Sequence, residues 1–189
     1  MRDSSTDQPT IMEVLTAHIR QHAPRTSDEA KTTDSQRPGG RLRHPPTPPS
    51  SPDADVQAVL TVLGRRTVVA AENPIWYRSG LPWSIDLTDT HLAGVQLQRA
   101  TLLNVCFDRA TLIKAGLVQA DLTGAGLGKA NLTNAYLVGA ILTGACLVKA
   151  DLTGAQVTRG ALTEKQLAEA SNVETIKWRE VGDFVAEPS

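Results

Sequence analysis

The sequence has little cysteine, few aromatic residues and almost no net charge. It has two cysteines among 189 residues, and residues 1–23 do not form a charged and then apolar leader. Both observations argue against a secreted protein held together by disulfides, so we expect a cytoplasmic protein. Aromatic residues make up 4% of the chain and the formal net charge is −1, which implies neither a basic protein that coats nucleic acid nor a wholly acidic one.

Patterns that carry catalysis or bind metal are also missing from the sequence. No nucleophile, base and acid stand at a suggestive spacing, and no glycine-rich phosphate loop follows a strand. His18 and His22 stand four residues apart without the neighbouring glutamate of a metalloprotease motif, and we interpret them as solvated. We therefore expect no enzyme activity, no catalytic residue, no cofactor and no metal.

Neither nucleic acid nor a membrane is expected as a direct partner. The basic clusters at 41–44 and 65–66 lack interleaved aromatic residues, which disfavours nucleic-acid binding. Residues 130–148 carry no charge, as a transmembrane helix would, but Asn131, Asn134 and an unbroken five-residue period do not suit a lipid-facing helix. We expect no membrane span in this chain.

The first half of the chain divides into three predicted segments. Residues 1–23 contain an amphipathic helix with Ile11, Val14, Leu15 and Ile19 on one stripe. Residues 24–52 are rich in proline and charge, without aromatic residues, which indicates a disordered linker. Residues 53–84 contain a second helix, with its apolar stripe at Val56, Val59, Leu60 and Leu63 and its end at Gly64, followed by the start of an N-terminal cap.

From residue 85 the dominant period is five. A large apolar residue stands at every fifth position from 87 to 162, Leu in all cases except Phe107 and Val157. Ala stands two places earlier at every fifth position from 110 to 155, and also at 100. Residues one position apart on an extended backbone point to the same side, so this pair points inward and the residue between them points outward.

The last two residues of each pentad are expected to turn the chain. Gly or Asn often stands last, as at Gly124 and Asn134, where a positive φ is favourable. If four pentads close one coil, the sixteen pentads of residues 85–164 form four coils. Coils stacked at the strand spacing would make a rod about 19 Å long.

The pentads resemble a known family. Residues 120–124 and 150–154 read Ala-Asp-Leu-Thr-Gly, and residues 130–134 read Ala-Asn-Leu-Thr-Asn. These motifs resemble the pentapeptide-repeat proteins, which implies a right-handed quadrilateral β-helix. We predict an all-β repeat solenoid of about four coils over 85–164, with α-helical N-terminal segments and a short helical C-terminal cap.

The outer segments complete this prediction. Residues ahead of the repeats resemble actinobacterial pentapeptide proteins that often carry membrane spans further upstream. This resemblance implies either a shortened relative or a misplaced start, and it leaves membrane association through a missing upstream segment open. Residues 165–189 form the predicted cap and tail, and a candidate capping box of Thr163 and Gln166 marks the start of its helix. Ile176, Trp178, Phe184 and Val185 are available to cover the last coil or to serve a dimer.

The repeat register predicts one interaction patch and the state of the cysteines. Val118, Tyr136 and Val138 are expected to point outward on a single face and to form a small apolar patch. Cys106 and Cys146 are expected to face outward, two coils apart, and to remain free thiols.

Two functions are in competition. The preferred one is a non-enzymatic scaffold that binds a protein, whose identity the sequence does not reveal and which can be a second copy of the chain. The alternative is a topoisomerase-binding DNA mimic of the quinolone-resistance type, implied by some relatives, which needs a continuous negative surface. Residues 85–164 instead hold six acidic and six basic residues, and Arg109, Lys129 and Lys149 stack in one basic column.

Overall fold

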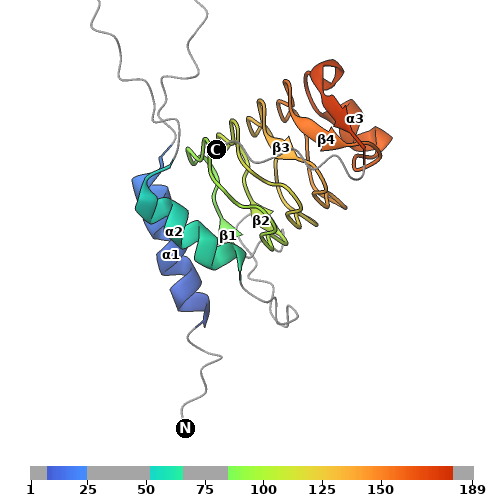
Figure 1. Cartoon of the computed structure of the whole chain (residues 1–189). Coiled ribbons are helices and arrows are strands. Elements are labelled where there is room, and N and C mark those ends of the chain that lie inside the picture. Colours follow the sequence, from blue (N-terminus) through green and yellow to red (C-terminus); the bar gives the residue numbers. More distant parts are fainter. Residues whose placement is uncertain (1–7, 25–51, 66–84, 181–189) are drawn as a thin grey trace, which may run out of the picture.

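A computed structural model describes residues 8–24, 52–65 and 85–180 (Figure 1). Most of the predicted linker, residues 66–84 of the predicted N-terminal cap, and the tail with Phe184 and Val185 lie outside the described residues.

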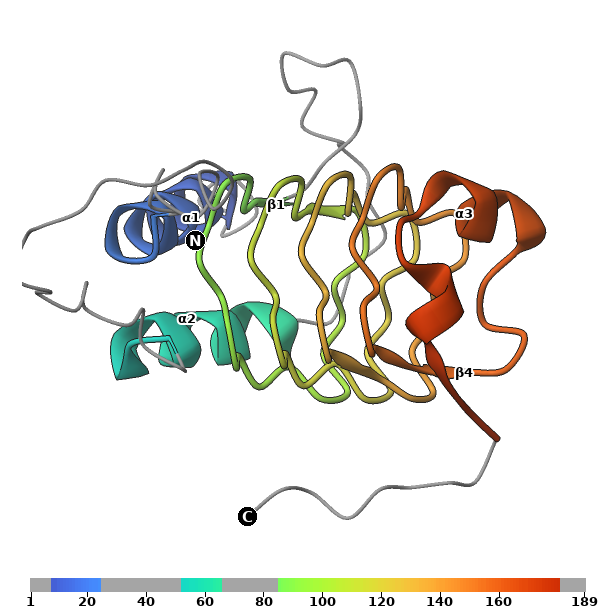
Figure 2. The ribbon, with the colours of Figure 1, turned by 90° about the horizontal axis from the view of Figure 1, so that it is seen from above.

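From residue 85 the backbone runs beside itself at a constant offset of twenty residues. β1 (Ile85–Asp86) pairs in parallel with β2 (Val105–Cys106), and β3 (Tyr136–Leu137) pairs in parallel with β4 (Gln156–Thr158). Isolated β-bridges, such as that from Thr111 to Asn131, repeat this twenty-residue offset on the other sides of the solenoid. Four pentads fill each offset, and Figures 1 and 2 show the resulting coils stacked one on the next. The predicted repeat solenoid is confirmed, as a β-helix with very short strands.

The axis of the solenoid is filled as the five-residue period predicts. All sixteen central residues from Leu87 to Leu162 are at most 8% exposed, and every Ala two places before a centre is buried. Complete burial of one such leucine contributes about 1.5–3 kcal/mol. The inward set therefore supplies most of the apolar core.

At the corners of the solenoid, more residue types adopt a positive φ than the sequence analysis predicts. The last residue of every pentad from Asp89 to Gly154 has a positive φ, including the predicted Gly and Asn positions. Arg, Lys, Asp and Gln adopt it too, as at Lys114, where φ is 56°. A hydrogen bond closes many of these turns, for example from the Ala115 N–H to the Leu112 oxygen at 3.0 Å. The stacked register thus imposes the left-handed conformation on residues for which it costs on the order of 1 kcal/mol.

Two helices cover the N-terminal end of the solenoid. They are α1 (Gln8–His22) and α2 (Ala54–Gly64), which contact each other (Figure 2). No preceding coil supplies hydrogen-bond acceptors for the backbone N–H groups of the first coil. Residues of α2 and the residue that follows α1 supply them. His91 N–H donates to the Ala23 oxygen at 2.7 Å, Thr101 N–H to the Gly64 oxygen at 2.8 Å, and Gln96 N–H to Gln57 Oε1 at 2.9 Å.

The apolar stripes of the two helices agree with prediction to different degrees. In α2, Val56, Leu60 and Leu63 are buried as predicted, and Val59 is half-buried. In α1, Ile19 is fully buried, but Val14 is 64% exposed. The predicted placement of Val14 on the buried stripe is wrong because α1 contacts the first coil mainly through its C-terminal part.

The C-terminal cap follows the course of one further coil. α3 (Glu164–Glu169) begins with the predicted capping box of Thr163 and Gln166. The chain then continues through a 3₁₀ turn, η2 (Val173–Thr175), to β5 (Lys177–Arg179), which pairs in parallel with β4. Ile176 is buried and Trp178 is half-buried against the core, as predicted.

Candidate interaction surface

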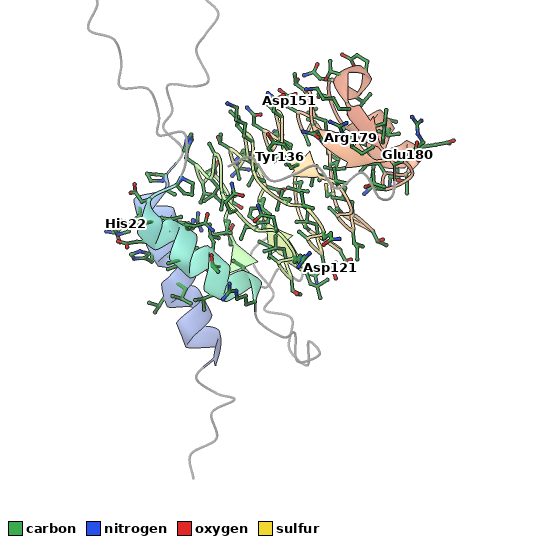
Figure 3. The ribbon with its side chains drawn as sticks, viewed as in Figure 1. His22, Asp121, Tyr136, Asp151, Arg179 and Glu180 are labelled. Atoms are coloured by element: carbon green, nitrogen blue, oxygen red, sulfur yellow. The ribbon has the colours of Figure 1, made fainter. Side chains whose placement is uncertain are left out.

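The three residues of the predicted patch lie on one side of the solenoid. This side, called the Tyr136 face, consists of pentads 95–99, 115–119, 135–139 and 155–159. Tyr136 pairs with Gly116 in the coil before it and with Gln156 in the coil after it. Gln119 N–H donates to the Val138 oxygen at 2.9 Å, so Val118 and Val138 also occupy neighbouring coils. Figure 3 labels Tyr136 midway along the solenoid.

The three residues of the predicted patch differ in how far they are buried. Val118 and Tyr136 are half-buried, whereas Val138 is only 6% exposed. Thr158, one coil further on, is buried beside it, and its Oγ1 accepts a hydrogen bond from Gly139 N–H at 2.7 Å. Val138 therefore does not point freely into solvent as expected, and the accessible part of the patch is Val118 with Tyr136.

Polar contacts border the Tyr136 face toward the C-terminal cap. The Arg179 guanidinium donates to Gln156 Oε1 from Nε at 3.1 Å and from Nη2 at 3.0 Å. Arg159 and Glu180 form an exposed ion pair at 3.0 Å. The sequence analysis missed this border, because the pairing of β5 with β4 that creates it has an offset of 21 residues, not 20.

At its other end the same face opens into a groove beside α2. The groove encloses about 390 Å³ and is polar, with Arg65 and Arg99 among its lining residues. Arg99 is held by a hydrogen bond from Nε to Gln119 Oε1 at 2.9 Å. The accessible patch of Val118 and Tyr136 thus lies between two polar regions, an arrangement typical of protein interfaces.

The two cysteines share a column, but only one is accessible. Gly126 bridges to Cys106 in the preceding coil and to Cys146 in the following one, and both thiols are free. Cys146 is exposed as predicted, whereas Cys106 is buried. Thr88 Oγ1 lies 3.2 Å from the Cys106 sulfur, and burial raises the pKa of this thiol above its usual value. The expectation that both cysteines face solvent is wrong for Cys106.

The described histidines do not form a metal centre. The rings of His18 and His22 stack with their centroids 4.3 Å apart. His91 Nε2 is buried without a hydrogen-bond partner. Within residues 8–24, 52–65 and 85–180, no three His, Cys, Asp or Glu side chains gather closely enough to hold a metal ion.

Comparison with known proteins found one matching family model and several similar solved structures. A family model described as pentapeptide repeats matches residues 115–154 in eight copies. HetL, involved in heterocyst differentiation regulation in the cyanobacterium Nostoc sp. strain PCC 7120, is 35% identical over 41% of this chain and 32% of its own, with a TM-score of 0.40. Rfr23 from the cyanobacterium Cyanothece 51142 is 32% identical over 51% of this chain and 62% of its own, with a TM-score of 0.40.

A more distant structure is QnrB1, a plasmid-mediated fluoroquinolone resistance protein. It is 14% identical over 50% of this chain and 65% of its own, with a TM-score of 0.25. No curated protein is significantly similar to the sequence. The chain spans about a third of HetL and less than two thirds of Rfr23.

The stacked coils and the inward Leu and Ala define a β-helix solenoid protein. Eight repeat copies are matched inside that solenoid, so its residues 115–154 match the pentapeptide-repeat family. Proteins of this family are generally structural or interaction modules. No helix among the residues that the structure describes is long and apolar enough to cross a membrane.

Proposed function

We propose that this protein is a non-enzymatic scaffold of the cytoplasm, built on a right-handed β-helix of about four coils, that binds a protein through its Tyr136 face. The observation that carries this proposal is a half-buried aromatic side chain on an otherwise regular surface. Tyr136 stands between Gly116 and Gln156 on a side that the backbone ladder holds rigid. A partly exposed aromatic residue held in a fixed position is a common anchor of an interface.

Val118 completes the accessible surface, and Val138 supports it from below. Because Val138 is buried, its role is to hold the neighbouring side chains in place, and it does not contact the partner directly. The Arg179 and Gln156 contact gives this surface a polar border. The partner we test first is a second copy of the chain, because one face can meet the same face of its copy across a two-fold axis.

The test compares two variants of the full chain. Tyr136→Asp introduces a charge that any contact at this face would bury, which costs several kcal/mol when the charge is unpaired. Ile141→Asp is the matched control, since Ile141 occupies the same place in its pentad, is 49% exposed and lies on another side. Light scattering should show self-association in the parent and in Ile141→Asp, and its loss in Tyr136→Asp. Equal association of all three would refute a role for the Tyr136 face in self-association.

The distribution of charge does not favour the DNA-mimic alternative. Acidic and basic residues balance in the repeats, and Arg109 neutralises Asp89 through two contacts of 2.8 and 2.6 Å. A mimic of duplex DNA needs an uninterrupted negative surface. A supercoiling assay with purified gyrase distinguishes the two functions, since a scaffold of this charge should leave gyrase unaffected. Dose-dependent inhibition would favour the mimic.

A further inference from the structure

A second surface lies on the opposite side of the solenoid. This side, called the Cys146 face, consists of pentads 85–89, 105–109, 125–129 and 145–149. At its N-terminal end the charged groups have partners. Arg109 binds Asp89 of the preceding coil, and Asp108 Oδ1 accepts a hydrogen bond from Gly128 N–H at 2.8 Å. This end therefore offers little unsatisfied charge to a partner.

The C-terminal end of the Cys146 face is different. Lys129 and Lys149 continue the column that contains Arg109, and both are exposed. Neither forms an ion pair with any residue of the described ranges. Lys129 N–H donates to the Val148 oxygen at 2.8 Å, so the two lysines belong to adjacent coils, about 4.8 Å apart along the axis. Two ammonium groups thus concentrate positive charge on one corner.

Exposed apolar atoms lie beside these lysines. Val148 is 40% exposed, and the Cys146 side chain in the same pentad is exposed as well. The other large apolar side chains exposed to this extent among the described residues are Val14 and Val62 on the helices and Ile141 on a neighbouring side. An exposed aliphatic group beside exposed cationic groups forms a small mixed surface that can contact a partner through both.

We propose that the Cys146 face binds an extended acidic segment of a partner protein. Its carboxylates meet Lys129 and Lys149, and an aliphatic or aromatic side chain between them packs on Val148. The positive charge of the two lysines favours a partner segment that carries carboxylates. The exposed Val148 favours a segment that also carries apolar side chains, because a polyanion without them would gain nothing from contact with Val148. The surface faces away from Tyr136, so this inference does not rest on the interface proposed above.

The test uses synthetic peptides and the full-length protein. One fluorescent heptapeptide alternates glutamate with leucine, a second alternates lysine with leucine, and a third contains glutamate alone. Fluorescence anisotropy should show binding of the Glu-Leu peptide, weakened by salt, and weak or undetectable binding of the other two. Equally tight binding of the all-glutamate peptide would overturn the proposal in favour of a simple polyanion site. Binding of the Lys-Leu peptide, or failure of the Glu-Leu peptide to bind, would also overturn it.

Matched variants locate the site. Lys149→Glu should weaken binding of the Glu-Leu peptide at least tenfold. Lys114→Glu should not, although Lys114 is exposed, occupies the same place in its pentad and has nearly the same φ, 56° against 57°. Val148→Ser should weaken binding severalfold, whereas Ile141→Ser, which removes a comparably exposed aliphatic group from another side, should not. Equal losses within either pair would contradict the assignment to this face.

Cys146 provides an independent readout. Saturating Glu-Leu peptide should slow alkylation of the Cys146 thiol, and the buried Cys106 serves as an internal reference. Unchanged alkylation under saturating peptide would place binding elsewhere and refute the proposal. Tyr136→Asp should leave peptide binding intact, so failure of either interface can be distinguished from failure of the other.

Discussion

The side-chain amide of Gln166 donates from Nε2 to the backbone oxygen of Leu142 at 2.8 Å, across 24 residues of sequence. The same nitrogen lies 3.0 Å from the Ala145 oxygen, and the side-chain oxygen accepts from Thr163 N–H at 3.0 Å. One buried side chain therefore begins α3 and satisfies carbonyl groups of the last regular coil.

Replacing this side chain should loosen the C-terminal end. Gln166→Leu is expected to lower the free energy of unfolding by about 2 kcal/mol, since buried carbonyl groups lose their donors and α3 loses half of its capping box. Urea denaturation measures this difference. The control Lys165→Leu changes a side chain that is 83% exposed and should have little effect. Equal midpoints for the two variants would mean that Gln166 does not secure the cap.

A charge on the solenoid axis should be far more costly. Leu127 is fully buried, and Leu127→Asp is expected to cost at least about 4 kcal/mol because the carboxylate has no partner there. Lys129→Asp, two residues away on an exposed corner, is the control. Thermal unfolding followed by circular dichroism compares them. If Leu127→Asp melts like the parent, the inward register is wrong.

The two thiols should react at very different rates. Cys146 is exposed, while burial both shields Cys106 and raises its pKa, which lowers its reactive thiolate fraction. Ellman's reagent at pH 8 should therefore show one fast and one slow phase under native conditions. Cys146→Ser should remove the fast phase alone. A single rate for both cysteines would contradict the burial of Cys106.

Acid should weaken the contact between Asp151 and the C-terminal cap. Burial alone raises the pKa of Asp151, but hydrogen bonds from the Asn172 side chain and from the Thr153 side chain and N–H outweigh this effect and lower it. A carboxyl whose pKa is lower in the folded state stabilises the fold above its unfolded pKa, about 3.9, and this contribution disappears as pH falls through the folded value.

The Asp151→Asn variant tests this effect. Its loss of stability relative to the parent should be constant near neutral pH and should shrink below about pH 4. Asp121→Asn serves as the control, because Asp121 occupies the same place in its pentad and binds Thr123 in the same way, without a cap residue equivalent to Asn172. Guanidinium denaturation at several pH values measures both. A pH-independent difference for Asp151→Asn would refute the prediction.

The repeat could be predicted in detail because its information is local. A residue such as Leu127 is inward whatever its neighbours are, since five-residue phase and the extended backbone determine its direction. The turn at Gly124 and the capping box at Thr163 and Gln166 depend likewise on residues a few positions apart.

Features that depend on neighbouring coils were harder to predict. Val138 and Cys106 occupy outward positions in their pentads, but residues twenty places away bury them. The participation of α1 in the N-terminal cap depends on the Ala23 carbonyl meeting His91, far along the chain. Val148 and Val138 occupy the same place in their pentads, but Val148 is 40% exposed and Val138 only 6%, so the repeat pattern alone does not determine their exposure.

The constant twenty-residue offset also determines which length changes this protein can tolerate without losing its surfaces. Deleting one pentad between two coils would rotate everything beyond it by about a quarter turn, because four pentads complete one coil. The Leu and Ala residues would still fill the axis, so such a chain could fold while Tyr136 moved to another side. Removing twenty residues shortens the solenoid and leaves every side aligned. Divergence in length by whole coils would therefore conserve binding surfaces, whereas divergence by single pentads would rearrange them.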